Sequence, residues 1–206
     1  MIDLGAKLSD GLQLLAIEAS ASQKDQLLSL LEQLLKWNKT YNLTAITDPE
    51  EVLTLHLFDS LAVKPLIKQK NIIDVGTGAG FPGLPLAIML PDVQFTLLDS
   101  NSKKIRFIHQ QIHLLGLTNV IAVHSRVENY QQQFDGIISR AFASLEDMIT
   151  ITAHLLDRNG CWLAMKGQYS KQEVINLSNI VDQVACYPLN VPGLSAERCL
   201  VELKAK

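Results

Sequence analysis

Apolar positions in the first third of the chain follow the spacing of helices. Between residues 22 and 37, leucines recur at intervals of three and four, which places them on one helical face. Ser22, with Asp25 three positions later, fits an N-terminal cap for this helix. A second helix is predicted within residues 49–63, where a proline and two acids stand at the start, as the helix dipole favours. We therefore expect the first 65 or so residues to be helical.

From residue 72 onward, short apolar segments alternate with amphipathic ones. Strands are predicted at residues 72–75, 94–99, 119–124, 134–139 and 161–166. Helices are predicted from Pro82 to Leu90, from Lys103 to Leu115, from Leu145 to Leu156 and near Lys171 to Val181. Strands and helices in alternation indicate parallel βαβ units, and hence an α/β fold with a doubly wound sheet.

The end of the chain departs from this alternation. Residues 183–191 and 198–205 both resemble strands, and only the turn-rich segment PGLSAE lies between them. Two strands with no helix between them are joined most simply as an antiparallel pair. We therefore expect a hairpin at one edge of the sheet.

Composition narrows the class of protein. The 206 residues are 48% hydrophobic and 19% charged, as in a folded chain with a sizeable core. A net charge of −3 gives no global signature of nucleic-acid binding, although a local basic patch can still contact phosphates. Cys161, Cys186 and Cys199 lack the close spacing of a zinc site or disulfide framework, so no metal is expected. The chain has neither a signal-peptide pattern nor a membrane-length apolar segment, which predicts a cytoplasmic protein without membrane contact.

The stretch IIDVGTGAGFPG, residues 72–83, can be read in two glycine frames. Gly76, Gly78 and Gly80 form one frame, and Gly78, Gly80 and Gly83 form the other, which is the dinucleotide fingerprint of oxidoreductases. The second frame would leave Gly76 inside the strand, where glycine weakens pairing. Because the apolar run ends at Val75, the first frame is favoured, and Pro82 then falls in the first turn of the next helix.

Two acids flank this glycine turn at the ends of predicted strands. Asp74, one residue before the strand ends, needs a donor at the carboxyl edge, either backbone amides or a ligand ammonium group. Asp99 ends the second strand, 23 positions after Gly76, where a carboxylate can accept hydrogen bonds from both ribose hydroxyls. Its alternative role is to cap the helix that opens at DSNSKK. The glycine turn favours the ligand role.

Several longer motifs resemble those of a known family. IDVGTGAGFPGLPLAI, FTLLDSNSKKIRFI, SRVE, ISRAFASL and MKG look like successive motifs of the RsmG family, also called glucose-inhibited division protein B. KWNKTYNLTAI and HLFDSL are similar to the helical motifs of that family, which methyltransferases in general lack. The resemblance runs from about residue 34 to the C-terminus.

The resemblance implies a class I methyltransferase that uses S-adenosyl-L-methionine and has a seven-stranded, Rossmann-like sheet with an antiparallel last strand. Residues 1–65 would form an N-terminal helical subdomain and residues 66–206 the methyltransferase domain, within one compact unit. The family methylates N7 of one guanine, position 527 in the 530 loop of 16S rRNA. Its cofactor contacts fall on Gly76, Phe81, Val127, Glu128 and Arg140, within a site that also includes Gly78, Gly80 and Asp99.

Methyl transfer to guanine N7 makes few demands on side-chain chemistry. The displacement requires donor and acceptor to be aligned, and N7 loses no proton, so no general base is needed and no catalytic residue is predicted. The fourth strand is followed by SRAFASL rather than the D/N-P-P-Y/F-like loop expected for an exocyclic-amine methyltransferase. Cys161, the candidate nucleophile of a pyrimidine C5 enzyme, lies early in an apolar strand and fits the core.

Basic residues supply the candidates for RNA contact. These are Lys36, Lys39, Arg126, Lys166 and Arg198. Lys36 and Lys39 flank Trp37, for which packing inside the helical subdomain is the favoured interpretation. Arg140, at the carboxyl edge of a central strand, could bind the methionine carboxylate or an RNA phosphate, and its structural alternative is a pair with Asp135 or Glu146.

Histidines are interpreted structurally. His109 and His113 stand at metal-binding spacing but lack the further ligands, so exposed helix histidines are expected. His56 and Asp59 share a helix face, and a hydrogen bond between them is favoured over RNA contact.

Three alternatives to the leading hypothesis stay open at this point. The chain could be a methyltransferase with another acceptor, a non-catalytic nucleoside-binding ribosome-assembly factor or, least favoured, a nicotinamide oxidoreductase. The expected partner is 16S rRNA or the small ribosomal subunit, and the expected oligomeric state is a monomer, because no extended apolar interface is evident.

Overall fold

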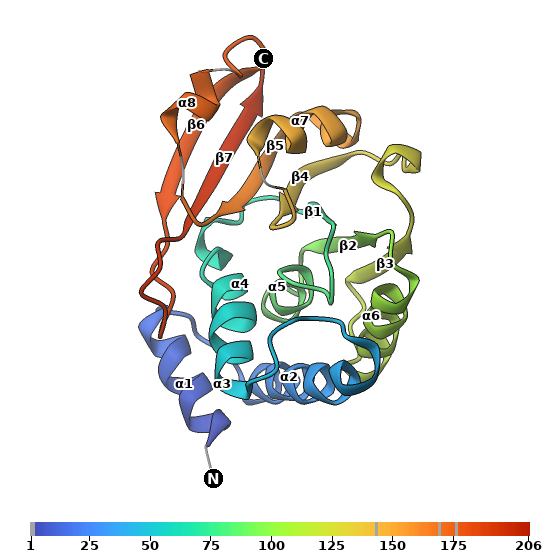
Figure 1. The fold of residues 1–206 in the computed structure, drawn as a ribbon, viewed down its shortest axis with the longest axis vertical. Helices are drawn as coiled ribbons and strands as arrows, with labels where there is room; N and C mark the ends of the chain where they lie inside the picture. The colour runs from blue at the N-terminus through green and yellow to red at the C-terminus, as the bar shows by residue number, and fades with distance from the viewer. Residues whose placement is uncertain (1–2, 143, 169, 176) are drawn as a thin grey trace.

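A seven-stranded sheet forms the centre of the molecule (Figure 1). The computed structural model describes residues 3–142, 144–168, 170–175 and 177–206. The strands are β1 (Asn71–Val75), β2 (Gln94–Asp99), β3 (Val120–His124), β4 (Phe134–Ser139), β5 (Leu156–Lys166), β6 (Val181–Pro188) and β7 (Cys199–Ala205). Their order is β3-β2-β1-β4-β5-β7-β6, which confirms the α/β class predicted from the alternating pattern.

Strands β1 to β5 pair in parallel, and β7 runs antiparallel to both of its neighbours. The hairpin expected at the end of the chain is present as β6 and β7. The second strand of the hairpin lies inside the sheet, between β5 and β6. Antiparallel β7 pairs its first residue, Cys199, with Lys166 at the end of β5.

Two apolar layers cover the sheet because successive side chains of a strand point to opposite faces. Ile72 of β1 packs in the cluster that contains α5 (Gly83–Met89), α6 (Ser102–Leu114) and the N-terminal helices, and its neighbour Ile73 packs in the cluster that contains α7 (Leu145–Thr152). Figure 1 shows α2, α5 and α6 on one side of the sheet and α7 on the other.

The N-terminal segment is helical, as predicted. It comprises α1 (Leu4–Leu14), α2 (Ala21–Tyr41), α3 (Pro49–Val52), the π-helical turn η1 (Leu53–Phe58) and α4 (Asp59–Leu61). The predicted cap at Ser22 is wrong, because Ser20 caps α2 in a reciprocal capping box with Gln23. Trp37 packs against Tyr41 and Phe107, with ring centroids 5.1 and 5.6 Å apart, which confirms its core role.

Element boundaries differ from the predictions mainly after β4. Helix α7 ends at Thr152, and a short 3-10 turn, Ala153–Leu155, leads into a fifth strand that begins five residues earlier than the predicted start at 161. Helix α8 spans Lys171–Ile175, and residue 176 of the predicted helix lies outside the described residues. None of the helices in the described part of the chain is long and apolar enough to cross a membrane.

Helix α1 is docked through a glycine. Gly11 is buried, and a Cβ atom at this position would lie 2.0 Å from Cζ of Phe58 in the π-helical turn. The close approach of the α1 backbone to an aromatic ring therefore requires a residue without a side chain.

Gly11→Ala should destabilise the protein, because the added methyl group forces the Phe58 ring away from its packed position. Overpacking costs about 1–3 kcal/mol, of which the better helix propensity of alanine offsets about 1 kcal/mol. Urea unfolding checks the change in free energy. Gly5→Ala on the same helix is the control, since its Cβ would lie 3.8 Å from Leu28 and 3.3 Å from the Asp3 carboxylate, which is exposed at the start of the helix. Equal unfolding midpoints for the two variants would contradict the docking role.

Candidate functional site

A glycine turn joins β1 to α5 at the carboxyl edge of the sheet. The strand ends at Val75, and Gly76, Gly78 and Gly80 all have positive φ, at 69°, 63° and 90°. The turn thus begins at Gly76, in the frame that the sequence favoured. A Cβ on Gly76 would lie 2.7 Å from Cβ of Ala141, so the backbone passes close to the loop after β4. Helix α5 begins at Gly83, with Pro82 as its N-cap residue rather than its first helical residue.

Asp74 is fully buried beneath this turn. Its Oδ2 accepts hydrogen bonds from the Thr77 hydroxyl at 2.7 Å and the Gly83 amide at 2.9 Å. Its Oδ1 has no hydrogen-bond partner among the described residues. Burial raises the pKa of Asp74 from 3.8 to about 6, and the two hydrogen bonds oppose that rise. A backbone amide was one of the two kinds of donor expected for this acid, and one does donate to Asp74, but only to Oδ2.

Asp99 ends β2 on the other side of the turn. Its Oδ2 accepts from the Gly78 amide at 2.9 Å, and its Oδ1 accepts from the Asn101 amide at 2.8 Å. The cap of α6 is Asn101, whose side chain accepts from the Lys103 amide. The helix-cap alternative for Asp99 is therefore wrong. Each carboxylate oxygen of Asp99 has accepted one hydrogen bond and retains capacity for another.

Two cavities meet at this edge of the sheet, and Gly76 and Ala141 line both. The smaller cavity, of about 370 Å³, has Asp99, Arg126, Val127 and Glu128 in its wall. The larger, of about 610 Å³, lies between the glycine turn, the N-terminal helices and the loop before β7. Gly78, Phe81, Arg140, Lys166 and Arg198 all line it.

The structure therefore brings together most of the predicted site residues. Gly80 lines neither cavity, and its place is structural, since a Cβ there would lie 2.4 Å from Cδ1 of Leu84. Lys36 and Lys39 also line neither cavity. Both are exposed near the end of α2, and Lys39 borders a separate cavity that shares Thr44 with the larger one.

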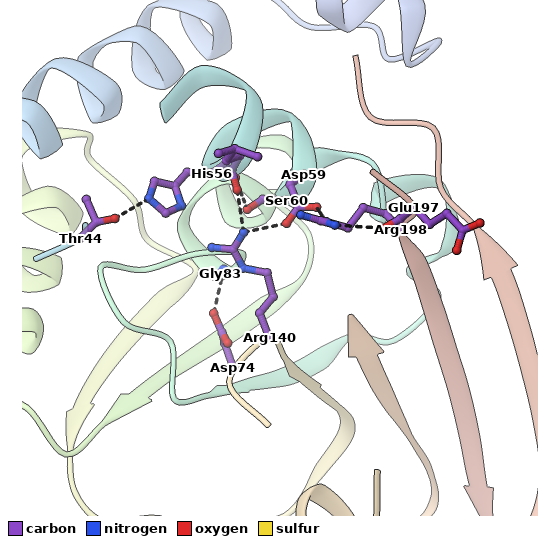
Figure 2. A network of polar contacts seen from close by, with 10 residues as sticks. Thr44, His56, Asp59, Ser60, Asp74, Gly83, Arg140, Glu197 and Arg198 are labelled. Atoms are coloured by element: carbon purple, nitrogen blue, oxygen red, sulfur yellow. Dashed lines mark hydrogen bonds and ion pairs between the residues drawn. The ribbon is translucent and has the colours of Figure 1, made fainter. Parts of the chain in front are cut away.

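Arg140 and Arg198 converge on one buried carboxylate in the larger cavity (Figure 2). Asp59 accepts from Nη1 of Arg140 at 2.7 Å and from Nε of Arg198 at 3.1 Å. Arg140 Nη1 also donates to the carbonyl oxygen of Leu55 at 3.1 Å. The alternative partners of Arg140, Asp135 and Glu146, form no ion pair with it, and Asp135 instead accepts from the amides of residues 70 and 71.

His56 lies in the same cavity wall. The sequence suggested a hydrogen bond between His56 and Asp59, but His56 pairs with a different residue. Its Nε2 forms a hydrogen bond with the Thr44 hydroxyl at 2.8 Å, and its ring stacks on Phe81 at a centroid distance of 5.1 Å. Burial, and then the Arg140 charge, lower the pKa of His56 to about 4, so the imidazole is neutral at physiological pH. His56 belongs to the π-helical turn, a feature often found at functional sites.

Two further residues considered in the sequence analysis, Lys166 and Cys161, are paired and buried respectively. Lys166 forms an ion pair with Glu173 at 2.6 Å. Burial raises the pKa of the Cys161 thiol to about 12, which confirms a core cysteine rather than an activated nucleophile. In the part of the chain that the structure describes, no group of three or more histidines, cysteines or acids could hold a metal ion.

Several cavity residues were absent from the predicted site. Asp59 and His56 had been interpreted as a structural pair, and Thr44, Met165 and Cys199 had no predicted role. Asp59 was detectable in principle, because an acid inside an apolar helix needs hydrogen-bond donors or a cation to offset its burial. Which cation it finds depends on the tertiary fold, since Arg140 is 81 positions away and Arg198 is 139 positions away.

The strand order, the reversed last strand and the glycine turn define the class I S-adenosylmethionine-dependent methyltransferase fold. The chain is similar to the solved structure of a SAM-dependent methyltransferase from Aquifex aeolicus, with a TM-score of 0.55 and 20% identity, covering 76% of this chain and 93% of that one. It is also similar to M. jannaschii TYW2 in complex with AdoMet, with a TM-score of 0.55 and 12% identity, covering 72% and 76%. These likenesses confirm the fold.

Sequence comparison identifies the family. The family model described as rRNA small subunit methyltransferase G matches residues 23–201. The curated ribosomal RNA small subunit methyltransferase G of Aeromonas salmonicida is 55% identical over 185 residues, which cover 89% of each chain. The protein of the same name from Alteromonas mediterranea is 47% identical over 206 residues, covering 99% of this chain and 98% of its own length. The chain belongs to the rRNA small subunit methyltransferase G family, as its motifs indicated.

Asp74→Asn should remove a pH dependence of stability. The pKa of the Asp74 carboxyl is higher in the folded protein than in the unfolded chain. Its contribution to the free energy of unfolding is therefore fully present below pH 3.8 and is lost as the pH rises through about 6. At 1.36 kcal/mol per pKa unit this amounts to about 3 kcal/mol. Urea unfolding from pH 4 to 7.5 should show the variant gaining stability relative to the wild type as pH rises. Asp92→Asn, at an exposed acid, is the control, and parallel pH curves for wild type and Asp74→Asn would refute the assignment.

Proposed function

We propose that this chain transfers the methyl group of S-adenosyl-L-methionine to N7 of a single guanine of 16S rRNA, position 527 in the 530 loop. Membership of a family whose name describes small-subunit rRNA methylation supports the substrate class. The observation that carries the proposal is the pair of cavities that meet at Gly76 and Ala141. One cavity can hold a nucleoside while the other admits an acceptor.

The smaller cavity fits the adenosine part of the cofactor. Asp99 retains acceptor capacity for the ribose hydroxyls, Val127 offers an apolar wall for the adenine ring, and Glu128 lies at the rim. At the junction of the cavities, Gly76 lets the backbone of the turn lie close to the loop after β4, because any side chain at this position would clash with Ala141. The residues present therefore fit the nucleoside without rearrangement of the turn.

The methionine part of the cofactor fits the junction with the larger cavity. Asp74 lies beneath the glycine turn that lines the cavities, and its buried Oδ1 has no partner in the described chain. An ammonium group would reach this oxygen only if the turn moved, because Asp74 lines neither cavity. Arg140 uses only Nη1 in its hydrogen bonds to Asp59 and Leu55, so the rest of its planar fork suits a carboxylate. Phe81, beside the glycine turn, adds an apolar surface.

The reaction needs alignment more than proton transfer. The cofactor supplies a methyl group activated by its bond to a sulfonium sulfur. Guanine N7 attacks this carbon in line, so that the N–C bond forms as the S–C bond breaks and the positive charge passes from sulfur to the base. No proton leaves N7. The neutral His56 imidazole in the cavity wall, with a pKa of about 4, is consistent with a site that does not run on general base catalysis.

RNA would approach the mouth of the larger cavity. Arg198 and Lys166 line it from adjacent strands, and Arg126 is exposed beside the smaller cavity. Lys39, beside the cavity that shares Thr44, and Lys36, earlier on α2, would add phosphate contacts. These basic groups, spread over the two cavities and the end of α2, would let a chain of net charge −3 bind a polyanion locally.

The experiment is methyl transfer from labelled S-adenosyl-L-methionine to small ribosomal subunits isolated from cells that lack this gene. The modified base is located by strand cleavage specific for N7-methylguanine. Label at one guanine of the 530 loop supports donor, acceptor atom and substrate together. Label elsewhere would retain a methyltransferase with another acceptor, and cofactor binding without any label would favour the nucleoside-binding assembly factor.

Asp99→Asn should weaken binding of S-adenosyl-L-methionine. Because the new side-chain NH2 also faces the Gly78 or Asn101 amide, the Tm is measured to establish that the variant is folded. The substitution keeps the size of the side chain but replaces one acceptor oxygen with a donor and removes the charge. Loss of a hydrogen bond to a charged group costs about 1.5–3 kcal/mol, so the Kd should rise at least tenfold. Isothermal titration calorimetry measures the change, with Asp92→Asn as the control acid. An unchanged Kd in Asp99→Asn would remove Asp99 from the cofactor site.

A further inference from the structure

Asp59 joins three parts of the chain at the wall of the larger cavity. It lies at the first position of α4, Arg140 directly follows β4, and Arg198 directly precedes β7. Its two carboxylate oxygens are divided between the two guanidinium groups, Oδ2 to Arg140 and Oδ1 to Arg198. Figure 2 shows the two arginine side chains reaching this carboxylate from different strands.

The three side chains differ in their access to solvent. Asp59 is 6% exposed, whereas Arg140 and Arg198 are 23% and 27% exposed. A buried carboxylate is costly unless it is paired or hydrogen-bonded, and Asp59 is paired with both cations. The arginines, being partly open to the cavity, can each make a further contact. The arrangement is therefore asymmetric, with a buried anchor and two guanidinium groups that face the site.

Each arginine keeps unused donors. Arg140 makes no hydrogen bond through Nε or Nη2 with any residue that the structure describes. Arg198 uses Nε for Asp59 and Nη1 for the carbonyl of Glu197, and its Nη2 is not engaged within the described chain. A guanidinium group held along one edge presents its other donors in a fixed plane, which suits a carboxylate or phosphate.

We propose that Asp59 is a positioning residue that fixes Arg140 toward the cofactor carboxylate and Arg198 toward an RNA phosphate, and so couples the cofactor site to the RNA site. The proposal rests on the proposed function, which places these arginines on the two ligands. Without the carboxylate, two like charges would face each other with no anion between them, and both long side chains would regain rotamer freedom.

The test compares Asp59→Asn with a matched variant on the same helical segment. Glu50→Gln breaks the ion pair with Lys7, at residues that line neither cavity, and serves as the control. In Asp59→Asn, the Kd for S-adenosyl-L-methionine should rise about tenfold, and kcat/KM for small subunits should fall further, about a hundredfold, because both arginines are released. Glu50→Gln should leave both quantities at the wild-type value. Changes in Asp59→Asn no larger than those of the control would overturn the proposal.

A merely structural ion pair is separated from a positioning role by double-mutant cycles. If Asp59 acts through the arginines, Asp59→Asn should have little further effect on KM once Arg198→Gln is present, and little further effect on cofactor Kd once Arg140→Gln is present. Additive effects in both cycles, or a loss of activity that tracks only the fall in Tm, would overturn the proposal. Asp59→Glu, which keeps the charge but displaces it by one methylene, should lose about three- to tenfold in kcat/KM, and it carries the test if Asp59→Asn does not fold.

The two readouts also separate this proposal from the proposed function. Cofactor binding is measured without RNA, so a raised Kd in Asp59→Asn supports the positioning of Arg140 even if wild-type protein fails to methylate small subunits. A wild type that methylates the subunits, together with an Asp59→Asn variant of unchanged Kd and KM, overturns only the role of Asp59.

Discussion

The buried carboxylate of Asp74 is the constraint on which the site depends. Its Oδ2 holds the Thr77 hydroxyl and the Gly83 amide at once, and thereby ties the end of β1 to the start of α5 across the glycine turn. Both cavities use this turn as a wall. The acid is held at an energetic cost, since burial raises its pKa to about 6, and its second oxygen is left without a partner in the described chain. The two hydrogen bonds that tie the turn together use only one of the two oxygens, so the other is a buried acceptor whose desolvation is not offset.

Acids organise the rest of the carboxyl edge in the same manner. Asp99 holds the Gly78 amide and so fixes the far side of the turn, and Asp59 holds two arginines from distant strands. In each case a carboxylate accepts hydrogen bonds from two segments and sets their spacing. The cationic groups that remain partly exposed then face the cavity. This explains how a chain with more acidic than basic residues can present arginines at this edge, because three of its acids there, Asp59, Asp74 and Asp99, are buried.

The sequence predicted what is encoded locally. The alternation of strands and helices, the frame that starts at Gly76 and the terminal hairpin all follow from neighbouring residues, and the structure has them. The cap of α2 was misplaced by two residues, because Ser20 and Ser22 both fit the local pattern and only the capping box distinguishes them. The two acids considered as structural partners of Arg140, as the alternative to a ligand role, do not pair with it, for a different reason. Nearby acids were considered, whereas the acid it binds is 81 positions away and is brought there only by the packing of the N-terminal helices on the sheet.

The direction of β7 decides whether the C-terminal segment can contribute to the site. In a parallel sheet the ligand-binding edge is formed by the carboxyl ends of the strands, so residues that precede a strand lie at the opposite edge. Because β7 is antiparallel, its first residue, Cys199, pairs with Lys166 at the carboxyl end of β5. Arg198 therefore lies at the functional edge although it precedes its strand, and it reaches Asp59 there. The antiparallel direction of β7, between β5 and β6, thus brings to the cavity a residue that precedes its strand and that would lie at the opposite edge if β7 were parallel.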